Sequence, residues 1–181
     1  MKGSEGKKAR LLSAKQIRKI LQRFCREILR EHKDSEQLAF IGIRTRGIFL
    51  ARRLCEMLRK AGAKEIPLGE MDITLYRDDL NTLLPEGRVD RTRIPFDITN
   101  RRIILFDDVL NTGRTARAAV DHLIDLGRPR MIHLAVLVDR GGREFPIAAN
   151  FVGKKTKLPA EGQVQVKLKE VDGIDEVVIS K

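Results

Sequence analysis

Asp107 and Asp108 are adjacent carboxylates at the end of a short apolar run, residues 103–106, in the stretch IILFDDVLNTGRTARAA. Two like charges this close repel each other, and neither adds anything to an apolar core. Residues 112–115 follow at the predicted start of a helix, where free backbone N–H groups and the helix dipole favour a phosphate. The aspartates would repel that phosphate, but they can accept hydrogen bonds from neighbouring hydroxyl groups. The pattern therefore predicts a sugar-phosphate site, with ribose hydroxyls on the aspartates and the phosphate in the loop.

The elements that must position this loop follow from the spacing of apolar residues. Continuous apolar runs of strand length alternate with segments in which apolar residues recur every three or four positions, as in an amphipathic helix. This alternation favours an α/β fold with a mainly parallel open sheet flanked by helices, in which ligands bind at the carboxyl ends of the strands. The predicted strands are 38–43, 66–76, 101–106 and 131–139, with short ones near 150–153, 164–168 and 176–180; the predicted helices are 14–31 (with Ser13 as N-cap), 47–62 and 115–126.

Composition places the chain among globular proteins. Its 181 residues are 42% apolar and 34% charged, enough for one domain with its own core, and no apolar run approaches the length of a membrane span. We predict a basic tail over residues 1–12 and a single domain over residues 13–181. We interpret the cysteines as core residues of a cytoplasmic protein and the histidines as structural or surface residues, because none has metal-ligand spacing. These residues are Cys25, Cys55, His32, His122 and His133.

Positive charge is concentrated at the N-terminus. The net charge is +11, and residues 1–33 hold eleven Lys or Arg against three Glu, a surplus of +8. Five basic residues of the predicted helix 14–31 fall within an arc of roughly 80°, given about 100° per residue. Two interpretations remain open: an ordinary solvated face, or a surface for a polyanion such as nucleic acid. The five residues are Lys15, Lys19, Arg23, Arg26 and Arg30.

The loop that follows the paired aspartates resembles the phosphoribosyl pyrophosphate (PRPP) binding motif of the type I phosphoribosyltransferases, in which an apolar strand, two acidic residues and an apolar pair precede T-G-x-T. Further stretches, among them GIRTRGIFLARRL, GEMDITLYRDDL, LAVLVDRGGREFPI and VGKK, are similar to successive segments of the PyrR family from about residue 10 to residue 180. The resemblance implies the type I phosphoribosyltransferase fold with a hood loop over the site. It also implies Mg²⁺, bound together with PRPP, as the cofactor.

The resemblance also implies roles for particular residues. Asp107 and Asp108 would be the catalytic carboxylates, which orient the ribose hydroxyls and stabilise positive charge on the ribose ring. The implied diphosphate loop is Arg44, Thr45, Arg46 and Gly47; the hood begins with Tyr76, Arg77, Asp78 and Asp79; the PRPP loop is Val109, Leu110, Asn111, Thr112, Gly113, Arg114 and Thr115. The implied base loop contains Asp139 and Arg140, and Val164 is a further substrate-binding residue. The implied RNA-binding residues are Arg18, Lys19, Arg23 and Arg26.

In the PyrR family such residues serve two activities. One transfers the phosphoribosyl group from PRPP to uracil, which gives UMP and diphosphate. The other is uridine-nucleotide-dependent binding to the leader mRNA of a pyrimidine operon, which controls transcription by attenuation. We therefore expect PRPP, uracil, UMP or UTP and leader mRNA as partners, no membrane, and a homodimer or larger homo-oligomer.

Two alternatives stay open. The chain could be the enzyme alone, with RNA regulation lost, or a purine phosphoribosyltransferase with the same PRPP loop. Two residues depart from the family pattern and bear on the first alternative. Asn111 stands where an aromatic residue is usual, and Gly142 replaces a histidine.

Overall fold

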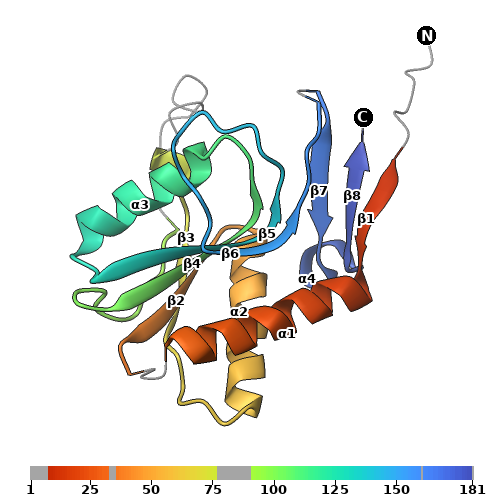
Figure 1. Cartoon of the computed structure of the whole chain (residues 1–181). Helices are drawn as coiled ribbons and strands as arrows, with labels where there is room; N and C mark the ends of the chain where they lie inside the picture. The colour runs from red at the N-terminus through yellow and green to blue at the C-terminus, as the bar shows by residue number, and fades with distance from the viewer. Residues whose placement is uncertain (1–7, 33–35, 77–90, 160, 181) are drawn as a thin grey trace.

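A computed structural model describes residues 8–32, 36–76, 91–159 and 161–180. Its centre is a five-stranded sheet with the order β3-β2-β4-β5-β6, in which every neighbouring pair of strands is parallel. Helices α1 and α2 cover one face of this sheet and α3 covers the other (Figure 1). The strands are β2 (Leu38–Ile43), β3 (Leu68–Met71), β4 (Arg102–Leu110), β5 (Met131–Asp139) and β6 (Phe151–Lys155); the helices are α1 (Ala14–Glu31), α2 (Arg46–Lys60) and α3 (Arg114–Leu126).

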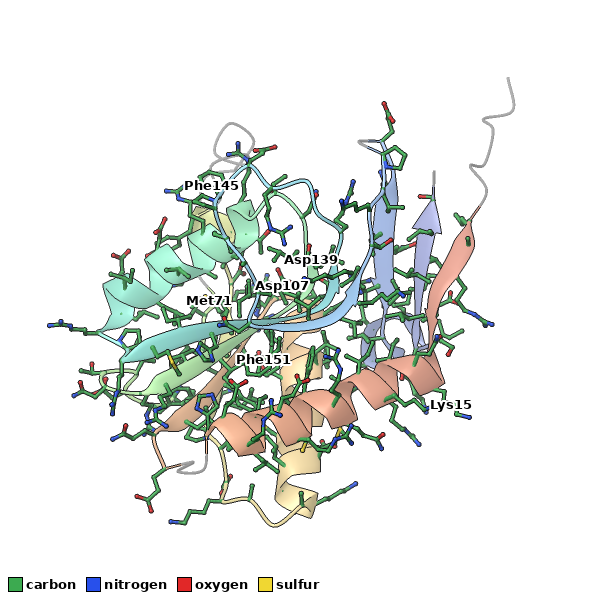
Figure 2. All side chains as sticks on the ribbon, in the orientation of Figure 1. Lys15, Met71, Asp107, Asp139, Phe145 and Phe151 are labelled. Atoms are coloured by element: carbon green, nitrogen blue, oxygen red, sulfur yellow. The ribbon has the colours of Figure 1, made fainter. Side chains whose placement is uncertain are left out.

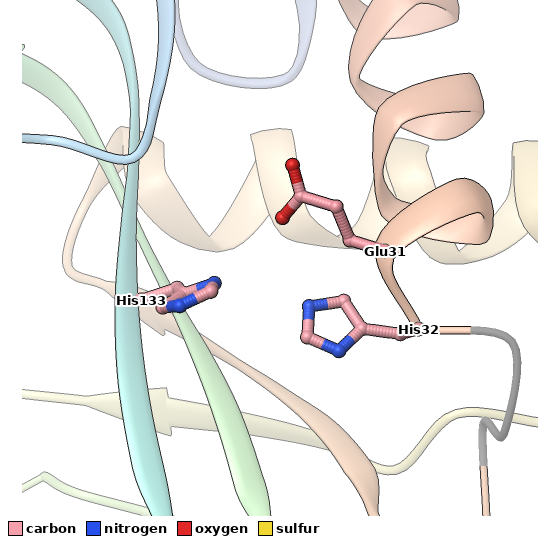
Figure 3. Close-up of side chains that lie close together, drawn as sticks. All are labelled: Glu31, His32 and His133. Atoms are coloured by element: carbon pink, nitrogen blue, oxygen red, sulfur yellow. The ribbon is translucent and has the colours of Figure 1, made fainter.

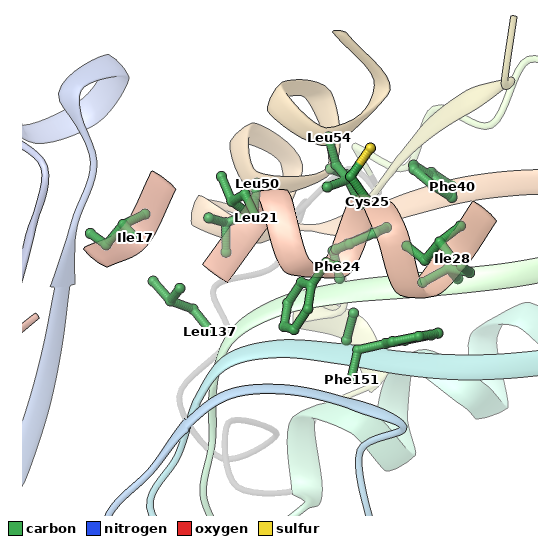
Figure 4. Close-up of a cluster of buried hydrophobic side chains, with 14 of the residues drawn as sticks. Ile17, Leu21, Phe24, Cys25, Ile28, Phe40, Leu50, Leu54, Leu137 and Phe151 are labelled. Carbon is green, nitrogen blue, oxygen red and sulfur yellow. The ribbon is translucent and has the colours of Figure 1, made fainter. Parts of the chain in front are cut away.

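The central sheet is buried on both faces, which explains its continuous apolar strands. Successive residues of β4 point to opposite faces, so that Phe106 enters the core under α1 and α2 while Leu105 enters the core under α3. Figure 4 shows the first of these cores, where Phe24 of α1 packs edge-on against Phe151 of β6, with ring centroids 6.1 Å apart. Burial on both faces fixes the register of the strands, and therefore the place where their carboxyl ends meet.

Helix α1 begins with a reciprocal cap. The Ser13 hydroxyl accepts the backbone N–H of Gln16 at 3.4 Å, and the Gln16 side-chain oxygen accepts the backbone N–H of Ser13 at 2.9 Å. The structure confirms the predicted helix 14–31 and its predicted N-cap. The residues that α1 buries recur at three- and four-residue spacing: Ile17, Leu21, Phe24, Cys25 and Ile28.

A second sheet stands beside the start of α1 and is antiparallel, with the order β1-β8-β7 (Figure 1). Its first strand includes residues 9–12, which the sequence analysis assigned to the basic tail, and Leu12 is only 3% exposed. The tail boundary at residue 12 is therefore wrong. The partner strand of β1 lies at the opposite end of the chain, so local composition could not indicate the pairing. The bounds are β1 (Ala9–Ser13), β7 (Gln163–Lys167), β8 (Glu176–Ser180) and a short helix α4 (Lys169–Asp172).

The strand predicted over residues 66–76 is shorter in the structure. It spans β3 alone and is followed by the 3₁₀ helix η1 (Thr74–Tyr76). The cause is Asp72, whose carboxylate accepts the backbone N–H of Thr74 at 3.0 Å and the Thr74 hydroxyl at 2.6 Å. A local turn of this kind competes with the sheet for the backbone. Alternation of polar and apolar residues after Met71 was therefore misread as a strand.

The strand predicted over residues 101–106 is longer in the structure. β4 runs through both aspartates to Leu110, because its pairing with β5 continues until Leu110 lies opposite Asp139. The predicted strands 38–43 and 131–139 are confirmed without change, and α2 and α3 each begin one residue before the predicted position.

The two cysteines are free thiols within the larger core. Cys25 is buried, and Cys55 packs against the same cluster. Burial raises the pKa of Cys25, and burial together with the charge of Glu56 raises the pKa of Cys55 to about 12. Both thiols are therefore protonated and unreactive at neutral pH, as expected of core residues. In the described ranges, no helix is long and apolar enough to cross a membrane.

Two of the three histidines lie together. His32 is the C-cap of α1 and only 4% exposed, and its ring centroid is 5.6 Å from that of His133 on β5. Burial, with help from His133 and the positive charge of Arg102, lowers the pKa of His32, so its imidazole is neutral. The third, His122 of α3, stacks on the ring of Tyr76. No spacing in the sequence indicated that His32 and His133 meet.

Candidate active site

The order of strands in the central sheet reverses between β2 and β4. From β2 the chain passes to β3 on one side and then to β4 on the other, and such a switch point opens a crevice at the carboxyl ends of the two strands. Helix α2 begins shortly after β2, and α3 shortly after β4. The N-cap residues of the two helices, Thr45 and Gly113, make no side-chain cap hydrogen bond, whereas α1 has a complete cap. At the start of α3 the Thr112 hydroxyl accepts the Arg114 backbone N–H at 3.3 Å. The other backbone N–H groups in the first turns of α2 and α3 therefore lie at the crevice, where they can bind anions.

The turn between β4 and α3 ends at Gly113, whose φ of +93° lies in the left-handed region that favours glycine. The loop that follows β5 closes over this turn, because the Thr112 carbonyl accepts the backbone N–H groups of Glu144 at 2.9 Å and Phe145 at 3.1 Å. The Arg114 guanidinium donates to Glu144 at 2.7 Å, so its charge is directed toward that carboxylate. Of the predicted PRPP loop, Val109 and Leu110 end β4, Asn111, Thr112 and Gly113 form the turn, and Arg114 and Thr115 begin α3.

The two aspartates lie near the carboxyl end of β4. Asp107 is 8% exposed and accepts the backbone N–H of Asp108 at 2.9 Å, and Asp108 in turn accepts that of Val109 at 3.0 Å. The start of α2 approaches this strand so closely that a Cβ on Gly47 would lie 2.2 Å from the Phe106 carbonyl oxygen and 3.2 Å from the Asp107 Cα. Only glycine fits at position 47. The structure thus brings the predicted diphosphate loop against the predicted catalytic carboxylates.

Both arginines of the predicted diphosphate loop form ion pairs within the protein. Arg44 donates to Glu70 at 3.0 Å, and Arg46 donates to the two carboxylate oxygens of Asp172 at 2.8 and 3.2 Å. The hydrogen bond from Arg46 holds the pKa of Asp172 below its usual range. The peptide bond between Arg44 and Thr45 is cis. Since these guanidinium groups face carboxylates, the backbone N–H groups at the start of α2 are the donors best placed for a diphosphate.

A second loop follows β5, the neighbour of β4, and begins at Asp139 (Figure 2). Arg143 lies at the centre of this loop. Its guanidinium is 2.7 Å from an Asp139 carboxylate oxygen and donates to the carbonyl oxygens of Asn111 at 2.6 Å and Ile147 at 2.9 Å. Burial opposes ionisation of Asp139, but hydrogen bonds from Arg143 and from the Gly141 backbone N–H hold its pKa below the usual range. One arginine thus ties the predicted base loop to the PRPP loop.

Arg143 was not among the residues predicted from the sequence. Its partners are Asp139 at the end of β5, Asn111 in the turn after β4 and Ile147 in the loop between β5 and β6, so no local pattern indicates its role. The two departures from the family pattern are also neighbours, which the sequence could not indicate. A Cβ on Gly142 would lie 3.0 Å from the Asn111 side-chain oxygen, and the φ of Gly142 is +73°. A histidine at position 142 would be strained by this φ, and its Cβ would press on the Asn111 side chain.

The remaining predicted substrate-binding residues do not gather as a group around Asp107 and Asp108. The Arg140 backbone N–H donates to the Leu110 carbonyl at 3.0 Å, which places Arg140 beside the PRPP loop. The Tyr76 hydroxyl donates to Asp125 at 2.9 Å, so Tyr76 is held against α3. Val164 lies in β7 of the antiparallel sheet, partly buried against the larger core. The other predicted hood residues, Arg77, Asp78 and Asp79, lie outside the described residues.

The predicted RNA-binding residues lie on different flanks of α1. Arg18 lines a groove between α1 and α2 together with Lys15, which points into solvent in Figure 2. Lys19 and Arg26 are exposed. Arg23 is on the flank toward β6, where its guanidinium donates to two backbone carbonyl oxygens of that strand at 2.7 and 3.1 Å. Arg23 therefore anchors α1 to the sheet, a structural role that the sequence analysis did not predict.

Comparison with known proteins identifies the family. The sequence model described as phosphoribosyl transferase domain matches residues 8–170. The chain is 55% identical over 170 residues to "Bifunctional protein PyrR" of Thermus aquaticus, which covers 94% of each chain. It is 53% identical over 168 residues to the protein of the same name from Deinococcus radiodurans, covering 93% of this chain and 92% of that one. The identity is 48% over 174 residues for that of Chloroflexus aurantiacus, with 96% of each chain covered.

Solved structures support the fold at much lower identity. A hypoxanthine phosphoribosyltransferase from Trypanosoma cruzi, in complex with the product IMP, superposes with a TM-score of 0.73 at 16% identity, over 100% of this chain and 97% of that one. A hypoxanthine-guanine phosphoribosyltransferase from Bacillus anthracis gives 0.72 at 20% identity, over 98% and 99% of the two chains. The five parallel strands with helices on both faces are therefore the type I phosphoribosyltransferase fold. The chain belongs to the phosphoribosyltransferase domain family and, within it, to the bifunctional PyrR proteins.

Proposed function

We propose that this protein transfers the phosphoribosyl group of PRPP to uracil and, with UMP or UTP bound, controls a pyrimidine operon through its leader mRNA. One observation carries the enzymatic half: two helix starts whose N-cap residues make no side-chain cap bond, and a pair of carboxylates, meet at the ends of β2 and β4. PRPP has a phosphate group at each end of its ribose and hydroxyls between them, which matches this order of partners. The names of the relatives agree with a protein of two functions.

The reaction in this proposal needs positioning and electrostatics, not a covalent nucleophile. The bond between ribose C1 and the diphosphate breaks, a bond from C1 to uracil N1 forms, and uracil loses its N1 proton. Positive charge develops on the ribose ring as the diphosphate leaves, and Asp107 and Asp108 stabilise that charge while they accept the ribose hydroxyls. The start of α2 receives the diphosphate and the start of α3 the 5-phosphate. Asp139 and Arg140 border the space for the base.

The same residues fit a magnesium ion bound together with PRPP. Asp107 and Asp108 supply carboxylate oxygens at the crevice, and PRPP adds hydroxyl and diphosphate oxygens. Oxygen ligands of this kind are those that Mg²⁺ prefers, usually with substrate phosphates in its coordination shell. When bound, the ion neutralises charge on the leaving diphosphate. The chain's own contribution is to hold the two carboxylates and the α2 backbone in one place.

Initial rates with uracil, hypoxanthine and guanine as alternative bases test the enzymatic half. We expect nucleotide formation from uracil in the presence of PRPP and Mg²⁺, and none from either purine, because the loop after β5 resembles the base loop of the PyrR family. Removal of Mg²⁺ should stop turnover, since the charge of the diphosphate is then not neutralised. Turnover of hypoxanthine or guanine instead of uracil would favour the purine enzyme that the sequence left open.

The RNA half of the proposal depends on the exposed positive charge of α1. The net charge of the chain is +11, and Arg18, Lys19 and Arg26 expose their side chains on this helix. Such side chains contact phosphates of a nucleic acid, which gives binding that weakens steeply with salt. Arg23 contributes less to RNA binding than its position on α1 suggested, because its guanidinium donates to carbonyl oxygens of β6. An enzyme without RNA binding, in which this face is merely solvated, is the competing interpretation.

Charge reversal on α1 tests the RNA half. We expect the variant Lys19→Glu with Arg26→Glu to lose most of its affinity for a leader hairpin, with a salt dependence shallower by about one unit for each phosphate contact removed. Turnover of uracil should be unchanged, because both residues lie on α1, which contributes none of the residues placed at the crevice. Arg23 is left intact, so α1 stays anchored.

The matched control for this test is Arg59→Glu with Lys64→Glu, which makes the same change of net charge around the end of α2. Binding assays across a salt series, with and without UMP and with a scrambled hairpin, separate the outcomes. Equal binding of both hairpins, with no effect of UMP, would show that the protein is an enzyme without sequence-specific RNA binding. Equal loss of affinity in the control variant would show that binding follows net charge only.

Three further parts of the proposal concern the whole protein. We propose one domain that extends from β1 to the C-terminus, and a cytoplasmic location, which suits two free cysteines. We also propose a homo-oligomer, supported by apolar side chains left exposed on the described surface. These are Leu29 at 36%, Ile124 at 60%, Leu126 at 48%, Val171 at 43% and Ile174 at 49% exposure.

A further inference from the structure

Glu31, His32 and His133 gather at the edge of the central sheet opposite the candidate active site. Glu31 is the last residue of α1, His32 is its C-cap, and His133 lies near the amino end of β5, whose carboxyl end carries Asp139. Figure 3 shows the three side chains arranged around one space. One donor atom from each lies within 4.8 Å of the other two. The packing of α1 on the sheet thus brings residues 31 and 32 next to a residue about 100 positions further along the chain.

The imidazoles of this cluster lack hydrogen-bond partners. His32 is 4% exposed, and among the described residues neither of its ring nitrogens has a partner. The Nδ1 atom of His133 is also buried without one. Buried polar atoms are nearly always paired, because leaving one unpaired forfeits its bonds to water. Each neutral imidazole has one nitrogen with a lone pair, so a ligand that accepts one lone pair from each ring would give both histidines a partner.

We propose that Glu31, His32 and His133 bind a divalent transition-metal ion of the class represented by Zn²⁺. Two imidazoles and one carboxylate are a frequent zinc ligand set and leave one position for water. Two ligand atoms about 2.1 Å from a tetrahedral ion lie about 3.4 Å apart, so atoms that are now as much as 4.8 Å apart must approach by up to about 1.4 Å. The exposed Glu31 side chain can make that movement.

The charges around the cluster both favour and oppose a cation. The site adjoins the C-terminal end of α1, whose last carbonyl groups carry partial negative charge, and Glu31 adds a full one. Arg102 and Arg130 line the same cavity, of about 380 Å³, and oppose a cation. An anion bound by these arginines is the competing occupant. The Glu31 carboxylate and the helix end repel an anion, however, and an anion would leave imidazole lone pairs unused, so the metal ion is favoured.

Titration of the full-length chain without an affinity tag, after treatment with a chelator, tests this site with Zn²⁺ alone as the probe. We expect one ion per chain by calorimetry, and a rise in melting temperature of roughly 5 to 10 °C at a free Zn²⁺ concentration 100-fold above Kd. The double variant His32→Gln with His133→Gln should lose this response. Glu31→Gln, a change at an exposed position, should weaken Zn²⁺ binding about 10- to 100-fold.

Two control variants match these changes. His122→Gln removes the chain's third histidine, and Glu56→Gln removes an exposed glutamate of α2. Both should keep the response to Zn²⁺. If the double histidine variant does not fold, X-ray absorption of the zinc-loaded parent decides the question, since two imidazole ligands are expected. Zinc binding unchanged in Glu31→Gln and in the double variant would overturn the proposal. A melting temperature raised by inorganic phosphate and not by Zn²⁺ would overturn it in favour of the anion.

Discussion

We expect the Asp107→Asn variant to form UMP about 10²- to 10³-fold more slowly than the parent protein, with the fold unchanged. The amide of asparagine has the shape of the carboxylate, and its oxygen can still accept the Asp108 backbone N–H that Asp107 accepts at 2.9 Å. What it lacks is negative charge. Because Asp107 is only 8% exposed, water screens that charge little. Its loss therefore raises the free energy mainly of the transition state, in which the ribose ring is positive.

This prediction separates a catalytic role from a structural one. An interaction made chiefly in the transition state lowers kcat more than it changes KM for PRPP, whereas a misfolded site changes both. Initial rates over a PRPP series, together with a thermal melt, measure the two effects. Asp121→Asn is the control, because Asp121 pairs with Arg117 on the exposed surface of α3. A parental rate for Asp107→Asn would contradict the assignment of this carboxylate to the reaction.

The frame of the active site could be predicted from the sequence because its strands are buried on both faces. Residues 38–43 are an uninterrupted apolar run, residues 131–139 are apolar except for His133 and Asp139, and the structure has strands with those limits. A strand buried on both faces consists mostly of apolar residues, so composition indicates where such strands lie. The paired aspartates follow such a run, and the glycine and threonines beyond them indicate the turn and helix that hold a phosphate. The site's position therefore followed from local signals.

The partners of the charged residues could not be predicted in this way. Arg46 pairs with Asp172, and Arg23 donates to carbonyl oxygens of β6. Each of these bonds joins segments distant in the chain, and an arginine's own neighbours do not indicate whether its charge is free. The basic arc predicted for the helix over residues 14–31 therefore included Arg23, although its guanidinium is hydrogen-bonded to the sheet. The meeting of His32 with His133 was missed for the same reason.

Arg143→Ala should have the largest effect on stability of the changes considered, because it removes one side chain that joins three segments. The guanidinium pairs with Asp139 at 2.7 Å and donates to the carbonyl oxygens of Asn111 and Ile147. The Arg143 side chain is 24% and that of Asp139 15% exposed, so the change leaves a mostly buried carboxylate without its cation. We expect the free energy of unfolding to fall by about 2–4 kcal/mol and the melting temperature by roughly 5 to 15 °C.

The pH dependence of this loss identifies its cause. The pKa of Asp139 is held below its usual range in the folded protein, so the stability that Arg143 provides is complete above the unfolded-state pKa of about 3.9. It disappears as pH falls through the lower, folded-state value. Chemical denaturation of parent and variant should therefore give a constant difference near neutral pH that shrinks below about pH 4. Arg117→Ala, at an exposed ion pair with Asp121, should cost at most about 1 kcal/mol. A difference for Arg143→Ala that persists unchanged in acid would show that its bonds to the carbonyl oxygens, and not its charge, hold the base loop against the PRPP loop.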